Sequence, residues 1–191
     1  MSKVFVEISA RHIHLSEEHV AKLFGEGHKL TIKKELSQPG QFACEEKVTV
    51  VGPRGEIKMS VLGPERANTQ IEITLTEARQ LGVEALVRES GKIEGTTGCK
   101  LVGPCGEVEI SEGIIAAKRH IHVSPEVAKE NGIKNGDVVK VEVKTAERSL
   151  IFGDVVVRES AAFAPGMYMH VDTDEANAAG MKGLTEGDLV L

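Results

Sequence analysis

The chain has 191 residues, which is enough for one large domain or for two domains of about 90 to 100 residues. Its formal net charge of -6 argues against a general nucleic-acid surface, and its apolar runs are too short to cross a bilayer. No cationic, hydrophobic leader precedes the first apolar segment, and an odd number of cysteines fits free thiols in a reducing compartment. These features predict a cytoplasmic protein that binds neither nucleic acid nor membranes.

Short runs of alternating β-branched residues dominate the chain and predict strands. They cover residues 4–9, 47–63, 69–75, 100–111, 137–145 and 149–160. Predicted helices are few and short, and each follows a residue suited to capping: Ser16, Thr76, Ser124 or Thr173. So many short strands favour barrels, because closure hides strand edges. We therefore predict a mainly β protein with two closed antiparallel β-barrels, each capped by short α-helices.

The tetrapeptide Arg-His-Ile-His occurs twice, at residues 11–14 and 119–122, and contains four of the seven histidines. Side chains alternate along a strand, so His12 and His14 lie on one face, roughly 6.5 to 7 Å apart along the chain, and His120 and His122 do the same. Each pair can therefore reach one metal ion. Neutral imidazole favours zinc, which commonly takes three protein ligands in a tetrahedral site.

A third ligand is easier to choose for one pair than for the other. His170 lies in an apolar strand pattern and is the natural third histidine, with an ordinary core or surface histidine as the alternative. Glu72 is a carboxylate in a strongly apolar strand, where burial would require a cation. Spacing alone, however, favours an outward-facing Glu72 on an edge strand. Cys44 is interpreted as a small buried thiol rather than a ligand or nucleophile.

Four ordered segments resemble one known family: "RHIHLS", "LSQPGQFACEEKVTVVGPRG", "VLGPERANTQIEI" and "RHIHVSPEVAKENGIKNGDVV". The chain resembles the phosphate propanoyltransferases of propanediol utilisation from about residue 4 to its C-terminus. The resemblance implies a zinc-dependent phosphotransacylase, which interconverts short-chain acyl-CoA (propanoyl-CoA or acetyl-CoA) plus phosphate with acyl phosphate plus CoA. It also implies that the first strand joins the C-terminal half. The expected domains are then β-barrel 1, from residues 1–10 and 114–191, and β-barrel 2, from residues 11–113.

The same resemblance assigns two zinc ions per chain. The first falls to His12, His14 and Glu72, with the sulfur of CoA able to take the open position, and the second falls to His120, His122 and His170. Arg66 matches the phosphate-binding arginine of the family. The positions that line the CoA site are Ser9, Lys34, Leu62 and Asn177. Ser60 stands where family members often carry an arginine beside CoA, so that contact is in doubt.

The chemistry expected from these residues is direct attack of phosphate on the thioester in a ternary complex. Gln38 and Gln41, in the polar turn "SQPGQ", are candidate donors to the phosphate. Two alternatives stay open: a dinuclear zinc hydrolase of thioesters or phosphoesters, and a non-catalytic, metal-stabilised barrel module. The chain begins almost at its first strand, so no microcompartment-targeting extension is expected. A homo-oligomer, the preferred acyl chain and the direction of flux are left open.

Overall fold

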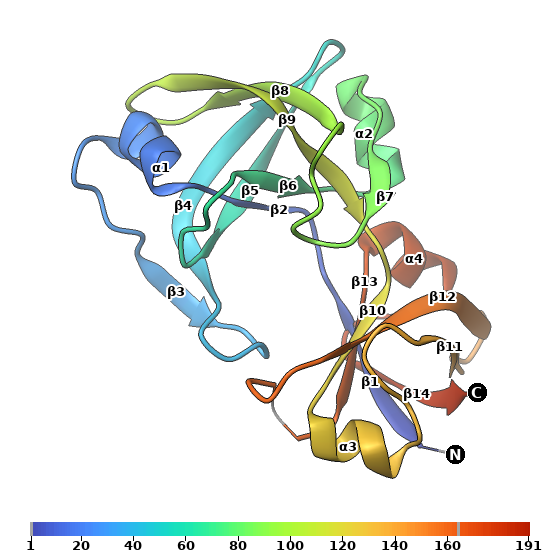
Figure 1. Ribbon diagram of the computed structural model, residues 1–191. Helices are drawn as coiled ribbons and strands as arrows, with labels where there is room; N and C mark the ends of the chain where they lie inside the picture. The colour runs from blue at the N-terminus through green and yellow to red at the C-terminus, as the bar shows by residue number, and fades with distance from the viewer. Residues whose placement is uncertain (1, 164) are drawn as a thin grey trace. The chain divides into compact units, whose positions relative to one another are not determined.

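The computed structural model describes residues 2–163 and 165–191. It divides into two compact units, one formed by the N-terminal residues up to Ala10 together with Lys118–Leu191, and the other by Arg11–Ala117. Each unit is built around one closed barrel, whose strands can be followed in Figure 1. No helix among the described residues is both long enough and apolar enough to cross a membrane.

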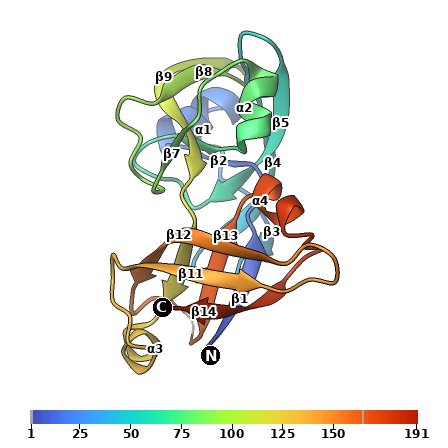
Figure 2. The same cartoon turned by 90° about the vertical axis from the view of Figure 1, so that its right-hand side faces the viewer.

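Barrel 1 is the closed sheet of the first unit, with the strand order β1-β13-β10-β12-β11-β14. Figure 2 shows β12, β11 and β14 side by side in one wall of this barrel. Its strands are β1 (Lys3–Ile8), β10 (His120–Val123), β11 (Val138–Val143), β12 (Leu150–Glu159), β13 (Met167–Val171) and β14 (Thr185–Val190). Its helices are α3 (Pro125–Glu130) and α4 (Thr173–Ala178).

Barrel 2 is the closed sheet of the second unit, with the order β9-β6-β2-β5-β4-β8, and β8 pairs again with β9. Its strands are β2 (His12–His14), β4 (Phe42–Val51), β5 (Glu56–Gly63), β6 (Gln70–Glu72), β8 (Thr97–Val102) and β9 (Glu107–Ala117). Two more strands, β3 (Ile32–Glu35) and β7 (Leu86–Arg88), extend the sheet beside β4 and β9. The helices are α1 (Glu17–Phe24) and α2 (Leu75–Leu81).

The two barrels share one pairing pattern. β10 lies between β12, in parallel, and β13, antiparallel, just as β2 lies between β5 and β6. β1 pairs in parallel with β13 and antiparallel with β14, as β9 does with β6 and β8. The strand that precedes each histidine strand in the sequence belongs to the other barrel. β1 precedes β2 of barrel 2 but is part of barrel 1, and β9 precedes β10 of barrel 1 but is part of barrel 2.

Aliphatic side chains build both cores, as the scarcity of aromatic residues predicts. In β1, Val4 and Val6 are fully buried and belong to the core of barrel 1. In β2, Ile13 is fully buried in the core of barrel 2, between two histidines that are themselves buried. Strand alternation therefore turns one face of each histidine strand into the core.

The predicted fold class is confirmed, but pairing within the barrels is mixed rather than antiparallel throughout. Four pairs are parallel: β1–β13, β10–β12, β2–β5 and β6–β9. A parallel pair requires a connection that returns the chain to the same end of the sheet, and α3 with β11 provides it between β10 and β12. The expected boundary after residue 113 also differs from the observed division, because Ile114–Ala117 pair with β6 and β7 of barrel 2.

Two helices also begin two residues or one residue earlier than predicted. Ser16 and Ser124 precede α1 and α3, but α2 and α4 begin after Thr74 and Asp172 rather than after Thr76 and Thr173. Each of these two caps accepts a hydrogen bond from the backbone of the glutamate three residues later, and that glutamate accepts one from the backbone of the cap. Such a reciprocal capping box satisfies two exposed N–H groups, so it defines the start of the helix.

Val6→Ala tests whether the N-terminal strand supports barrel 1. Removing two buried methyl groups should lower the free energy of unfolding by about 2 kcal/mol and should speed amide hydrogen exchange in β13 and β14, the partners of β1. Lys3→Ala, on the exposed face of the same strand, is the control and should stay within about 0.5 kcal/mol of the wild type. Unchanged protection of β13 and β14 in Val6→Ala would contradict this role of β1.

Candidate metal centres

In barrel 2, antiparallel pairing of β2 with β6 places Glu72 directly opposite His12. His12, His14 and Glu72 each offer one ligand atom, and these atoms lie within 4.8 Å of one another. His12 Nε2 is 3.5 Å from Glu72 Oε2. Two ligands of one tetrahedral zinc, each about 2.0 to 2.1 Å from the ion, stand roughly 3.4 Å apart, so this spacing fits a shared ion.

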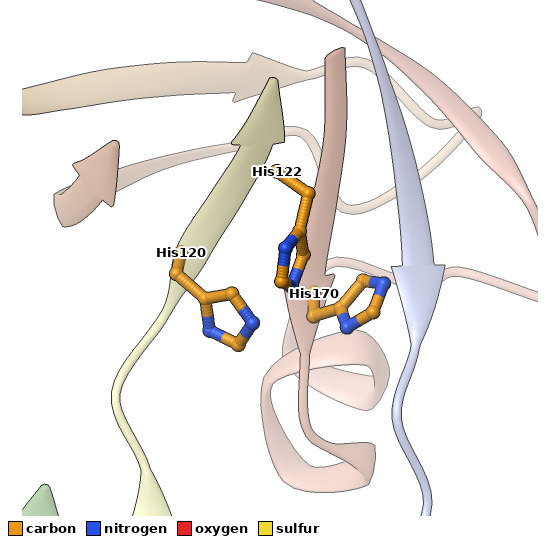
Figure 3. Close-up of side chains that lie close together, drawn as sticks. All are labelled: His120, His122 and His170. Carbon is orange, nitrogen blue, oxygen red and sulfur yellow. The ribbon is translucent and has the colours of Figure 1, made fainter. Parts of the chain in front are cut away.

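In barrel 1, antiparallel pairing of β10 with β13 places His170 directly opposite His120. Figure 3 shows the imidazoles of His120, His122 and His170 turned toward one another from these two strands. One ring nitrogen from each histidine falls within 4.8 Å of the other two. Because the two barrels share their pairing, Glu72 and His170 occupy equivalent positions, each opposite the first histidine of its pair.

Hydrogen bonds at the outer ring nitrogens orient three of these histidines. Nδ1 of His14 lies 3.2 Å from the carbonyl oxygen of Leu62, and Nδ1 of His120 lies 2.8 Å from that of Lys118. A carbonyl oxygen can only accept, so each Nδ1 carries the proton and Nε2 keeps its lone pair for a metal. His170 Nε2 lies 3.1 Å from Glu7 Oε2, which leaves Nδ1 as its ligand atom.

Burial keeps the imidazoles of His14 and His122 neutral. It lowers the pKa of His14 to about 3, with the neighbouring His12 adding to the effect. Burial likewise lowers the pKa of His122 to about 2, assisted by His120 and His170. Neutral imidazole is the form that binds a metal, so no proton has to leave either group at pH 7. The donor sets, two nitrogens with one oxygen and three nitrogens, both fit zinc.

A closed hydrogen-bond network fixes the carboxylate of Glu72. Its Oε1 accepts from Gln70 Nε2 at 2.7 Å and from Ser90 Oγ at 2.9 Å, which leaves Oε2 facing His12. Gln70 is oriented in turn, because its own Oε1 accepts from the backbone N–H of Gly91 at 2.7 Å. Partners of this kind orient a metal-ligating carboxylate and contribute to metal affinity.

Arg66 reaches the same network. Its Nη1 donates to Ser90 Oγ at 3.2 Å, so one hydroxyl links the arginine to Glu72. The backbone N–H of Arg66 donates to the carbonyl of Leu15 at 2.9 Å, which fixes its loop at the end of β2. The half-buried guanidinium also helps to lower the pKa of His14, behind burial and His12. This arginine therefore lies beside the barrel 2 group, where an anion would meet both.

Two of the expected CoA positions lie along one row of the barrel 2 sheet. Lys34 pairs with Ala43, Ala43 pairs with Leu62, and the carbonyl of Leu62 accepts from His14. Gln38 and Gln41 lie in the turn between β3 and β4, where Gln41 N–H donates to the carbonyl of Gln38 at 3.1 Å. Ser60 pairs with His12 on β5. Cross-strand neighbours therefore lead from the exposed Lys34 to His14 of the metal group in the same barrel.

The other two expected CoA positions belong to barrel 1. Ser9 directly follows β1, and its N–H donates to the carbonyl of Val171, the residue after His170, at 2.8 Å. Asn177 is exposed in α4, the helix that follows His170. Ser9 is thus hydrogen-bonded to β13, the strand that carries His170, and Asn177 lies in the helix that follows that strand.

Cys44 and Cys99 are not activated nucleophiles. Cys44 is buried, as predicted, and burial raises its pKa to about 11. Burial also raises the pKa of Cys99 to about 12. Cys105 lies exposed in a hairpin turn, and its thiol donates to the carbonyl of Phe24. Both shifted thiols therefore stay protonated at neutral pH, whereas the thiolate is the reactive form.

A sequence profile of the phosphate propanoyltransferase family matches residues 5–182. The chain belongs to this family. It is 52% identical over 183 residues to the phosphate propanoyltransferase of Enterococcus faecalis, an alignment that covers 95% of this chain and 84% of that protein. It is also 52% identical over 188 residues to the phosphate propanoyltransferase of Thermotoga maritima, covering 98% and 87%. The predicted family and the prediction of an acyltransferase are both confirmed.

For this phosphate propanoyltransferase family member, sequence reasoning missed the residues that orient the ligands. Gln70 could have been predicted from the sequence, because it precedes Glu72 by two positions and strand alternation puts both side chains on one face. Ser90 and Glu7 carried no local signal, since each meets its partner only through pairing of distant segments. Two further histidines outside the metal groups have side-chain partners: His19 contacts Thr69 Oγ1 at 2.7 Å, and His28 contacts Glu46 at 2.8 Å.

Elemental analysis of the purified protein should find close to two zinc or similar divalent ions per chain, one for each group. Replacing both His120 and His122 by Ala should remove about one ion, because the three nitrogens of barrel 1 are then reduced to one. The matched variant, with His12 and His14 replaced, should remove the other. Full metal content in either double variant would refute the corresponding ligand set.

Proposed function

We propose that this chain reversibly transfers the acyl group of propanoyl-CoA or acetyl-CoA to phosphate. One observation carries the proposal: Arg66 is joined through the hydroxyl of Ser90 to Glu72, a member of the barrel 2 metal group. An anion-binding guanidinium beside a metal group is what phosphate recognition requires. The names of the relatives supply the propanoyl group and the phosphate.

Each barrel would hold one zinc ion, through His12, His14 and Glu72 in barrel 2 and through His120, His122 and His170 in barrel 1. Bound zinc supplies Lewis acidity toward carbonyl and phosphate oxygens, and it is thiophilic enough to accept a leaving thiolate. The contribution of the protein is geometric. Carbonyl oxygens of Leu62 and Lys118 select the ring nitrogen that faces the ion in His14 and His120.

Arg66 would bind the attacking phosphate. Its planar guanidinium presents two parallel N–H donors that match two phosphate oxygens, and its charge favours the dianion. Ser90 accepts from Arg66 and from Gln70 while donating to Glu72, so the arginine is oriented by a hydroxyl with no freedom to turn. Gln38 and Gln41 are the next candidates for donors to phosphate, from the turn between β3 and β4.

In the proposed step, a phosphate oxygen forms a bond to the thioester carbonyl carbon. The carbon–sulfur bond then breaks, and the sulfur leaves with the electron pair as the CoA thiolate. Because phosphate itself is the nucleophile, no acyl-enzyme is needed, and both substrates must be bound together. The raised pKa values of Cys44 and Cys99 support this route, since neither buried thiol is ionised for attack at neutral pH.

CoA recognition would use Lys34, Leu62, Ser9 and Asn177. Lys34 is exposed on β3 and offers a positive charge to the phosphates of CoA. Leu62 is half-buried next to His14 and offers an apolar contact. Ser9 and Asn177 offer polar groups from barrel 1. Ser60, at the position where relatives often have an arginine, provides only a hydroxyl next to His12.

Thiol release from acyl-CoA tests the reaction class. The zinc-loaded protein should release CoA from propanoyl-CoA only when phosphate or arsenate is present, because water is not the nucleophile. Acetyl-CoA and butanoyl-CoA, compared under the same conditions, measure the preference for the acyl chain. Release of CoA at the same rate without phosphate would identify a thioester hydrolase and overturn the proposal.

Arg66→Ala should lower kcat/KM for phosphate by two to four powers of ten, because two charge-assisted hydrogen bonds of about 1.5 to 3 kcal/mol each are lost. Arg66→Lys should recover part of the activity, since it keeps the charge without the planar pair of donors. Zinc content and CoA affinity should stay close to wild type. Normal phosphate saturation curves in Arg66→Ala would move the phosphate site elsewhere, with Lys34 and the Gln38–Gln41 turn as the next candidates.

A further inference from the structure

Each Arg-His-Ile-His segment begins with an arginine that pairs with a helix-capping glutamate. In barrel 2, Arg11 Nη1 lies 2.7 Å from Glu77 Oε1, and in barrel 1, Arg119 Nε lies 2.7 Å from Glu175 Oε1. Glu77 belongs to α2, which follows the strand of Glu72, and Glu175 belongs to α4, which follows the strand of His170. The first residue of each tetrapeptide is therefore paired with the helix that directly follows the strand of the third metal ligand.

The second oxygen of each glutamate completes this connection. Glu77 Oε2 accepts from the backbone N–H of Thr74 at 2.9 Å, and Glu175 Oε2 accepts from that of Asp172 at 3.0 Å. Thr74 and Asp172 each stand two residues after a third ligand, Glu72 or His170. One carboxylate thus bridges the residue before the first histidine and the backbone just beyond the third ligand.

The arginines also contact the strand on the other side of the histidines. Arg119 Nη1 donates to the carbonyl of Gly153 on β12 at 2.9 Å, and its guanidinium lies 5.7 Å from the centre of the Phe152 ring. Arg11 Nε lies 3.5 Å from the carbonyl of Lys58 on β5, at the limit of a hydrogen bond. Each guanidinium therefore reaches from the strand on one side of the histidine strand to the helix that follows the strand on its other side.

Both arginines lie where the chain passes from one barrel to the other. The division between the units falls between Ala10 and Arg11 and again between Ala117 and Lys118. The histidine strands that follow are short, with three residues in β2 and four in β10. Such short strands have few ladder hydrogen bonds to hold their ends, so an anchor at the point of entry has a large effect on the direction of the histidines.

We propose that Arg11 and Arg119 are positioning residues, which act through Glu77 and Glu175 to hold each histidine pair in line with its third metal ligand. The proposal rests on metal binding by the two groups, as proposed above. The link occurs in both barrels although the capping residues differ, threonine in one and aspartate in the other. What the two barrels have in common is the bridge from arginine through glutamate to the third-ligand strand.

Stability alone does not account for such a pair. An ion pair with one partner half-exposed, such as Arg11 with Glu77, contributes little to folding, because water screens it. In barrel 1, burial raises the pKa of Glu175 to about 7, and the charge of Arg119 opposes that rise. Outer partners that orient metal ligands, by contrast, typically change metal affinity by about 10 to 100-fold when they are removed.

Cobalt(II) titration followed by visible absorption tests the proposal one centre at a time. The Arg119 variants are made in a protein whose His12 and His14 are both Ala, so that only the barrel 1 group remains, and the Arg11 variants are made in the reciprocal background. Arg119→Gln should weaken cobalt binding by about 10 to 100-fold and alter the absorption bands that report coordination geometry. Arg119→Lys should restore part of the affinity, because it keeps the charge facing Glu175.

Matched controls separate positioning from general destabilisation. Lys3→Gln in barrel 1 and Lys100→Gln in barrel 2 remove ion pairs of 2.8 and 2.9 Å between strands that carry no ligand. These controls should bind cobalt as their backgrounds do. Glu175→Gln can still cap α4, so its loss of affinity should be smaller than that of Glu175→Ala.

The outcomes distinguish this proposal from the proposed function. If neither single-centre background binds cobalt, metal binding itself is refuted, and the positioning role with it. If both backgrounds bind but Arg119→Gln and Arg11→Gln bind as tightly with unchanged spectra, only the positioning role is overturned. An equal loss of cobalt affinity in Lys3→Gln and Lys100→Gln would also overturn the positioning role, because any surface ion pair would then have the same effect.

Discussion

The register between two short antiparallel strands is the constraint on which each metal group depends. A slip of one residue between β2 and β6 would turn His12 and His14 away and bring Ile13 to the ligand face. Ile13 and Ile71, which face each other across this pair, are both fully buried in the core of barrel 2. The same slip would therefore expose apolar side chains, so the packing of the core protects the ligand geometry.

Identical pairing in the two barrels has led to different electrostatics at equivalent positions. The barrel 2 group includes a carboxylate, Glu72, whose charge offsets part of that of a bound divalent ion. The barrel 1 group offers three imidazole nitrogens and no carboxylate, and Glu7 lies one hydrogen bond further out, on His170. An ion held by the barrel 1 group would therefore keep more of its positive charge than one held by the barrel 2 group.

Local patterns allowed prediction of the strands, the barrels and the paired histidines, because alternation along a strand depends only on neighbouring residues. The same alternation occurs in parallel and antiparallel strands, so mixed pairing could not be read from it. The apolar strand made Glu72 a candidate, but only the family resemblance favoured it as a ligand over an outward-facing residue, since its partner His12 is distant in the sequence. The helix starts at Thr74 and Asp172 were missed because Thr76 and Thr173 are equally good capping residues by type, and only the reciprocal glutamate distinguishes them.

The exchange of entering strands has a consequence for how the chain is made. Barrel 2 needs only residues 11–117 and can close midway through synthesis, whereas β1 must wait for β13 and β14 near the end of the chain. In barrel 2, β6 alone separates β2 from β9, so its two chain ends leave about two strand spacings apart, roughly 10 Å. In barrel 1, β13 alone separates β1 from β10. A folded barrel 2 thus brings the two ends of residues 11–117 close together, which lowers the entropic cost of pairing β1 within barrel 1 compared with a flexible loop of the same length.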